Sequence, residues 1–171
     1  MKSFKFCPQC GSDQLYRNKP FVLDCPQCEF QLFINPVAAV AGIIKNNCGD
    51  MLMVRRAFNP KIGMLDLPGG FVNVEESAED ALFREIKEEL NLEVISCLFI
   101  KSQANEYKYN SVTYYPLDLF FECTVKSFDN IILQDEVSDY YFIPIQQLDI
   151  NLVAFDSVKS VLSWYKNQIW N

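Results

Sequence analysis

The sequence predicts an α/β protein in which a mixed sheet with helices on both sides forms an α/β/α sandwich, preceded by a small cysteine-rich module. Three observations predict this class. Two closely spaced cysteine pairs occupy the first 28 residues, apolar runs of strand length follow them, and two segments have the spacing of helices. Half of the 171 residues are hydrophobic, which is enough for one core beside a small module.

The cysteine pairs predict a metal site. Cys7-Pro-Gln-Cys10 and Cys25-Pro-Gln-Cys28 each present two thiolates, and together they complete a tetrahedral shell of four sulfurs. The spacing favours structural Zn²⁺, with iron in a rubredoxin-like site as the minor alternative. Disulfides are the other interpretation of four cysteines, but thiols stay reduced inside cells.

We place this zinc ribbon at residues 1–34 and a second domain at residues 35–171. A ribbon of this size cannot bury enough surface to fold alone, so the metal is expected to supply its stability. The expected elements are a hairpin of residues 15–16 and 21–23 with its turn at 18–20, then a linker at 30–36. The remaining cysteines are expected to be ordinary packed or surface residues; they are Cys48, Cys97 and Cys123.

The second domain alternates apolar runs with turns. The expected strands lie at residues 37–44, 51–55, 93–102, 112–126 and 140–143. The first two flank a turn at 46–50 and are typical of a hairpin. Residues 59–66 and 103–111 are expected to be loops. Residues 157–168 have helical spacing and are expected to form the last helix.

An acidic helix follows the turn at Gly69 and Gly70. Ser77 with Asp80 three residues later indicates an N-terminal cap, and Asn91 is suited to the left-handed conformation that ends a helix. One face is apolar and is expected to be buried; it is made of Leu82, Phe83, Ile86 and Leu90.

The same helix carries a candidate metal site. Glu85, Glu88 and Glu89 fall within an arc of about 100°, and like charges so close need a cation among them. Carboxylate oxygens suit Mg²⁺ or Mn²⁺, ions that in turn hold phosphates. Arg84 is expected to pair with Glu88 and Glu76 and to orient carboxylates. The alternative is a solvated amphipathic helix with simple i,i+4 pairs.

Composition excludes several classes of function. The net charge is −7 and no run of Lys or Arg occurs, so broad binding to nucleic acid or to anionic membranes is not expected. The absence of histidine excludes Ser-His and Cys-His nucleophiles. The N-terminus lacks the apolar region of a secretory signal, and the longest apolar run is too short to span a bilayer. We therefore expect a soluble, cytoplasmic protein.

The region around the acidic helix resembles the box of the Nudix hydrolase family, G-x5-E-x7-R-E-U-x-E-E-x-G-U, where U is bulky and aliphatic. Eight of the nine fixed positions match, and Asn91 replaces the last glycine. The matching residues are Gly70, Glu76, Arg84, Glu85, Ile86, Glu88, Glu89 and Leu92. The resemblance implies a Nudix-type sandwich and a metal-dependent pyrophosphohydrolase.

The resemblance also implies roles for single residues. Glu85, Glu88 and Glu89 would bind the catalytic Mg²⁺ or Mn²⁺, together with the carbonyl of Gly69, and one of the glutamates is an alternative base. Family members often add a later acidic residue as ligand or base. In this chain Glu136 is favoured for that role over its rivals Asp135 and Asp139, and a plain surface turn is the alternative.

The ribbon resembles the N-terminal module of NADH pyrophosphatases, which favours a dinucleotide or an ADP-ribose-like substrate. The array S-Q-P-W-P-F-P-x-S that marks NADH specificity in that branch has no counterpart here, so the resemblance leaves the substrate open. Aromatic residues available to sandwich a base, each otherwise expected in the core, are Phe71, Tyr107, Tyr109, Tyr114, Tyr115 and Trp164.

Two other functions compete with the enzyme. One is a zinc-ribbon regulatory protein that uses the Nudix fold as a nucleotide sensor, which predicts damaged box carboxylates or a basic surface. The box carboxylates are intact and no basic surface is evident. The other is an iron redox protein built on the four cysteines, which would be coloured. We expect the ribbon itself to serve the structure or an oligomer such as a homodimer.

Overall fold

The computed structural model describes residues 4–168 and contains two compact units, Met1–Pro36 and Val37–Asn171. The outer ends of the two expected domains, residues 1–3 and 169–171, lie outside the described residues. Among residues 4–168, no helix is both long and apolar enough to cross a bilayer.

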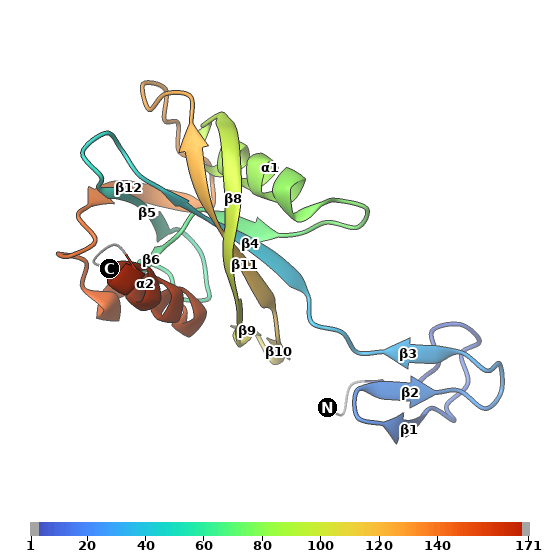
Figure 1. The fold of residues 1–171 in the computed structure, drawn as a ribbon. Coiled ribbons are helices and arrows are strands. Elements are labelled where there is room, and N and C mark those ends of the chain that lie inside the picture. The colour runs from blue at the N-terminus through green and yellow to red at the C-terminus, as the bar shows by residue number, and fades with distance from the viewer. Residues whose placement is uncertain (1–3, 169–171) are drawn as a thin grey trace. The chain divides into compact units, whose positions relative to one another are not determined.

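The first unit is a three-stranded antiparallel sheet in the order β1-β2-β3 (Figure 1). Its strands are β1 (Tyr16–Lys19), β2 (Val22–Asp24) and β3 (Gln31–Phe33). The expected linker at 30–36 is wrong in part, because β3 pairs with β2 and completes the sheet. The expected turn at 18–20 is displaced as well. Strand β1 continues to Lys19, with an irregular register between Arg17 and Lys19, and the turn falls at Pro20 and Phe21.

The second unit holds two larger sheets, a small hairpin and two helices (Figure 1). The first sheet has the order β7-β4-β11-β8 and the second the order β12-β5-β6. Their strands are β4 (Ala38–Ile44), β5 (Met51–Arg56), β6 (Leu65–Asp66), β7 (Gly69–Phe71), β8 (Val94–Ala104), β11 (Leu117–Val125) and β12 (Val137–Ile143). The hairpin is β9 (Tyr107–Tyr109) and β10 (Val112–Tyr114), and the helical segments are α1 (Ala78–Leu90), α2 (Asp156–Gln168) and the 3₁₀ turn η1 (Ile150–Leu152).

The prediction of an α/β fold with a mixed sheet is confirmed. Strand β11 runs parallel to β4 and antiparallel to β8. Alternate residues of β4 enter different cores: Val40 and Ile44 pack with the apolar face of α1, whereas Ile43 packs with that of α2. Because both faces of β4 are covered, its sequence is a continuous apolar run and does not alternate between apolar and polar residues.

The expected hairpin of residues 37–44 with 51–55 is wrong. Strand β4 pairs on its two sides with β7 and β11 in the first sheet, whereas β5 pairs with β6 and β12 in the second sheet. Only an isolated bridge between Lys45 and Met51 connects the two runs. The expected loops at 59–66 and 103–111 are wrong in part too, since they contain β6 and β9.

The predicted caps of α1 are confirmed. The side chain of Ser77 accepts a hydrogen bond from the Asp80 backbone N–H, and Asn91 adopts the left-handed conformation with φ 57°. Of the predicted apolar face, Leu82, Ile86 and Leu90 are buried, whereas Phe83 is only half-buried at its edge. The helix is therefore held at both ends and along one side, which fixes the direction of its glutamates.

Candidate active site

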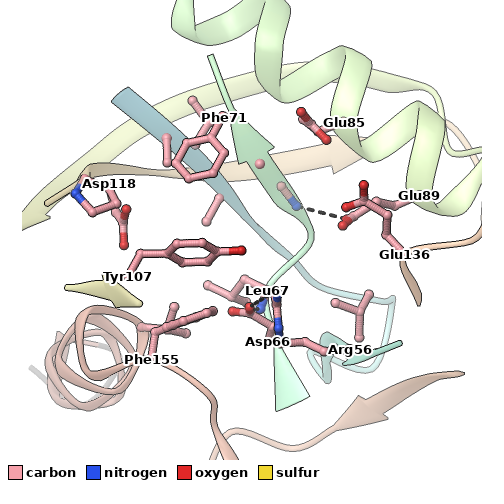
Figure 2. Close-up of a pocket in the computed structure, with 18 of the residues that line it drawn as sticks. Arg56, Asp66, Leu67, Phe71, Glu85, Glu89, Tyr107, Asp118, Glu136 and Phe155 are labelled. Carbon is pink, nitrogen blue, oxygen red and sulfur yellow. Dashed lines mark hydrogen bonds and ion pairs between the residues drawn. The ribbon is translucent and has the colours of Figure 1, made fainter. Parts of the chain in front are cut away.

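A cavity of about 610 Å³ opens in the second unit, between α1, α2 and the strands. At one side lie Glu85, Glu89 and Glu136, and at the other side lies Asp118 (Figure 2). The rings of Phe71 and Tyr107 lie between these two sides (Figure 2). Strand β7 and helix α1, the two elements that carry the Nudix-like box, thus both contribute to the wall of one cavity.

Arg84 holds the carboxylates of the box. Its guanidinium donates to both oxygens of Glu76 at 2.8 and 2.9 Å, to Glu85 at 2.7 Å and to Glu88 at 3.3 Å, and to the carbonyl of Phe71 at 3.1 Å. The hydrogen bonds from Arg84 lower the pKa of Glu76 to about 2. Glu88 is the loosest partner, with a side chain 62% exposed. The predicted orienting role of Arg84 accords with these contacts.

The two glycines allow β7 to approach its neighbours closely, at Gly69 the strand β4 and at Gly70 the helix α1. A β-carbon on Gly69, whose φ is +146°, would lie 2.1 Å from the carbonyl oxygen of Val40. A β-carbon on Gly70 would lie 2.5 Å from the carboxyl carbon of Glu85. The Gly69 N–H donates to Glu89 Oε2 at 3.0 Å, as the dashed line in Figure 2 shows. The turn therefore places backbone polar groups directly beside the glutamates.

On the acidic side of the cavity the carboxyl groups outnumber the guanidinium of Arg84. Burial raises the pKa of Glu89 well above its ordinary value, and repulsion from Asp66, Glu85 and Glu136 adds to this, although the Gly69 N–H opposes it. Burial also raises the pKa of Glu85, against the opposing effect of Arg84. Buried oxygen donors of like charge fit a hard divalent cation such as Mg²⁺ or Mn²⁺.

The later acidic residues differ in where they lie. Glu136 lines the cavity on the side of Glu85 and Glu89 (Figure 2). Asp135 is not among the lining residues. Asp139 accepts a hydrogen bond of 2.6 Å from the hydroxyl of Tyr141, which lowers its pKa, and it does not line the cavity either. Of the three rivals, Glu136 alone faces the box carboxylates.

Three charged lining residues escaped the sequence reasoning: Arg56, Asp66 and Asp118. Arg56 donates to Asp66 at 3.0 Å and stacks over the ring of Phe155 at 5.0 Å. Each aspartate stands between two leucines in an apolar strand. A charged residue is unusual at such a position, and this feature of the sequence could have identified both. Their side-chain partners, Arg56 for Asp66 and Asn105 and Ser157 for Asp118, lie on other elements, which sequence spacing does not reveal.

Asp66 makes the stability of the second unit depend on pH. Its burial raises its pKa to about 6, although Arg56 and the Leu67 N–H oppose the shift. The folded state therefore holds a proton that the unfolded chain releases near its ordinary pKa of 3.8, so stability falls as pH rises from about 4 to about 6. A shift of this size corresponds to roughly 3 kcal/mol.

We expect Asp66→Asn to gain stability relative to the wild type by about that amount between pH 4 and pH 7, because the amide cannot ionise. Urea unfolding over a pH series, without added Mg²⁺ or Mn²⁺, measures the difference. Asp129→Asn, the same change at an exposed aspartate outside the cavity, serves as the control for the substitution itself. Parallel curves for Asp66→Asn would show that this carboxyl keeps its ordinary pKa.

The candidate aromatic residues divide into two groups. Phe71, Tyr107 and Tyr109 line the cavity, whereas Tyr114, Tyr115 and Trp164 do not. Tyr107 contacts Phe71 edge to face, with ring centroids 5.6 Å apart, and it also lies 5.6 Å from Phe155, which sequence reasoning missed. These rings form an apolar wall suited to a flat heterocycle.

The four cysteines of the first unit converge. Their sulfurs all lie within 4.8 Å of one another, with Cys7–Cys28 and Cys10–Cys25 distances of 3.7 Å. A tetrahedral Zn²⁺ with bonds of about 2.3 Å separates its sulfurs by about 3.8 Å. The arrangement therefore fits a four-sulfur metal site. The other cysteines belong to the second unit: Cys48 is exposed, Cys97 half-buried and Cys123 buried.

Comparison with known proteins agrees with this geometry. Residues 35–164 match the family model of the NUDIX domain. The chain is 27% identical over 135 residues to the NAD-capped RNA hydrolase NudC of Pseudomonas aeruginosa, a match that covers 79% of this chain and 46% of the relative. It is 44% identical over 64 residues to the ADP-ribose pyrophosphatase of Methanocaldococcus jannaschii, over 37% of each chain.

Among solved structures, the fold is similar to a Nudix hydrolase from Nitrosomonas europaea. The TM-score is 0.74 at 24% identity, and the match covers 96% of this chain and 92% of that one. The matched segments cover less than half the length of each of these two curated relatives. The similarity in structure thus extends along nearly the whole chain, whereas the similarity to the curated relatives covers only part of their length.

Proposed function

The chain belongs to the Nudix family, and we propose that it is a metal-dependent pyrophosphohydrolase that cleaves the diphosphate bond of a nucleoside diphosphate linked to another group. One observation carries the proposal: Glu85, Glu89 and Glu136 line the same end of one cavity, where these carboxylates outnumber the guanidinium of Arg84 that pairs with Glu85. A cavity end of this kind favours a divalent cation and, through it, a phosphate.

In this proposal Glu85, Glu88 and Glu89, with the carbonyl of Gly69, hold Mg²⁺ or Mn²⁺. When bound, the ion neutralises phosphate charge and lowers the pKa of the attacking water. Arg84 keeps Glu85 and Glu88 in orientation through its short hydrogen bonds. Glu136, which lines the cavity beside them, accepts the proton of the water.

The proposed substrate is a dinucleotide or an ADP-ribose-like molecule. The names of the relatives support this, since one hydrolyses NAD-capped RNA and another acts on ADP-ribose. The aromatic wall of Phe71, Tyr107 and Phe155 supports it as well, because it offers a nucleobase a surface beside the acidic end.

We further propose that residues 1–34 are a ribbon with structural Zn²⁺ bound by the four cysteines, and that residues 35–171 are the hydrolase domain. The convergence of the sulfurs supports the zinc assignment. Among the described residues of the first unit only Cys7, Asp24 and Cys25 are buried, so Asp24 is the one buried residue besides two of the proposed metal ligands.

The test is incubation of the purified protein, with Mg²⁺ or Mn²⁺, with NADH, NAD⁺, FAD, ADP-ribose, diadenosine polyphosphates, oxidised dGTP and NAD-capped RNA. Chromatography should show metal-dependent release of a mononucleotide from at least one of the dinucleotides or from ADP-ribose. Tight binding of one of these molecules without turnover would instead support the nucleotide sensor. Cleavage of oxidised dGTP alone would contradict the proposed substrate class.

A further inference from the structure

Asp118 lies at the end of the cavity opposite the box glutamates and has no part in the proposed chemistry. The residue is only 7% exposed, yet it lines the cavity, and in Figure 2 its carboxylate points toward Tyr107. A buried carboxylate in an apolar strand is costly unless it has partners. Its partners therefore indicate what the site is built to hold.

Both partners of Asp118 bind the same oxygen. The Ser157 hydroxyl donates to Oδ2 at 2.6 Å, and the amide nitrogen of Asn105 donates to Oδ2 at 2.8 Å. Oδ1 receives no hydrogen bond from the described residues. Among these residues no fully buried side-chain oxygen lacks a partner, so Oδ1 must reach accessible space. One carboxylate oxygen is thus fixed by the protein and the other is left as an acceptor at the cavity.

The surroundings of Asp118 narrow the choice of ligand. Tyr107 and Phe71 lie between it and the glutamates, so a flat ring that contacts them can present its edge to Oδ1 while its phosphates extend to the acidic end (Figure 2). A carboxylate accepts but does not donate, so it favours an edge that carries N–H groups and rejects one that carries only acceptors.

We propose that Asp118 is a specificity residue that accepts a hydrogen bond from an N–H group of the substrate's nucleobase, such as the 6-amino group of adenine. This inference rests on the proposed function in one respect: it takes the phosphates of the substrate to lie at the acidic end of the cavity. Ser157 and Asn105 are positioning residues, because they hold Oδ2 and so direct Oδ1 into the cavity.

The experiment compares the binding of two nucleotides by calorimetry, with Mg²⁺ present. AMP carries the 6-amino group, and purine riboside 5′-monophosphate lacks it and is otherwise the same. The wild type should bind AMP about tenfold or more tightly, as expected for a hydrogen bond to a charged acceptor. In Asp118→Asn the ratio of the two affinities should fall to about threefold or less, mainly because AMP binds more weakly than it does to the wild type.

Two controls separate recognition from packing. Asp129→Asn removes another aspartate that accepts a 2.6 Å hydrogen bond from a serine hydroxyl, but outside the cavity, and should keep the full preference. Ser157→Ala removes one of the two hydrogen bonds to Oδ2 but keeps the carboxylate, so it should lower the preference for AMP less than Asp118→Asn does, whatever its effect on the melting temperature. Equal weakening of both nucleotides by Asp118→Asn would overturn the inference and indicate a structural role.

The outcomes distinguish this inference from the proposed function. Hydrolysis of a dinucleotide with no preference for AMP overturns the role of Asp118 alone. A preference for AMP that depends on Asp118, in a protein that hydrolyses nothing in the panel, overturns the hydrolase and keeps the recognition site. Failure to bind either nucleotide up to about 10 mM overturns the inference as well.

Discussion

Glu89→Gln is expected to lower kcat by about a thousandfold or more while leaving the fold and the zinc content intact. Glu89 is the most buried of the box carboxylates, at 8% exposure, and it is fixed by the Gly69 N–H. The change keeps the shape of the side chain and removes the charge that would hold the metal, so the loss falls on the chemical step. Steady-state kinetics on whichever substrate the panel identifies measures it.

The matched control is Glu79→Gln, the same change on the same helix at an exposed position outside the cavity. It should retain nearly full activity. The metal-free Glu89→Gln protein should melt no lower than the wild type, because burial already disfavours the charged carboxyl. If Glu89→Gln kept more than about a tenth of the activity, the assignment of Glu89 as a metal ligand would be wrong.

Cys25→Ser should unfold the first unit. Cys25 is almost fully buried, its sulfur lies 3.7 Å from that of Cys10, and few other buried residues stabilise the small sheet. Structural zinc in sites of this kind contributes about 10–16 kcal/mol of apparent binding energy, far more than a sheet of this size gains by burial. Elemental analysis should show the loss of one zinc per chain, and amide resonances of the first unit should lose their dispersion.

Cys48→Ser is the control for this experiment, since Cys48 is an exposed cysteine of the second unit. It should keep its zinc and its full spectrum. Dispersed resonances from β1, β2 and β3 in zinc-free Cys25→Ser would contradict the account, because the sheet would then be stable without metal. A coloured protein containing iron would contradict the assignment of zinc.

Local sequence patterns were enough to predict the parts of the protein that depend on spacing along the chain. The caps at Ser77 and Asn91 and the contacts of Arg84 lie within one helix and its preceding turn, where helical geometry relates residue number to position. The convergence of the four sulfurs likewise follows from two knuckles joined by a short hairpin. The α/β fold class followed from the order of apolar runs.

Strand pairing and the far end of the cavity were not predictable in this way. β4 pairs with β11, some eighty residues later, rather than with the nearby β5, because sheet neighbours are chosen by burial on both faces and not by proximity. Asp118 meets Ser157 only when α2 packs on the sheet. Single charges inside apolar strands marked Asp66 and Asp118, but their partners were set by tertiary structure.

The most direct test of the central claim is hydrolysis in ¹⁸O-labelled water, with mass spectrometry of both products. If the acidic end of the cavity binds a divalent cation that activates water, label should enter the phosphate of one product, only when Mg²⁺ or Mn²⁺ is present. The Glu89→Gln protein should incorporate almost none. Cleavage that proceeds without divalent metal, or that leaves both phosphates unlabelled, would contradict the account.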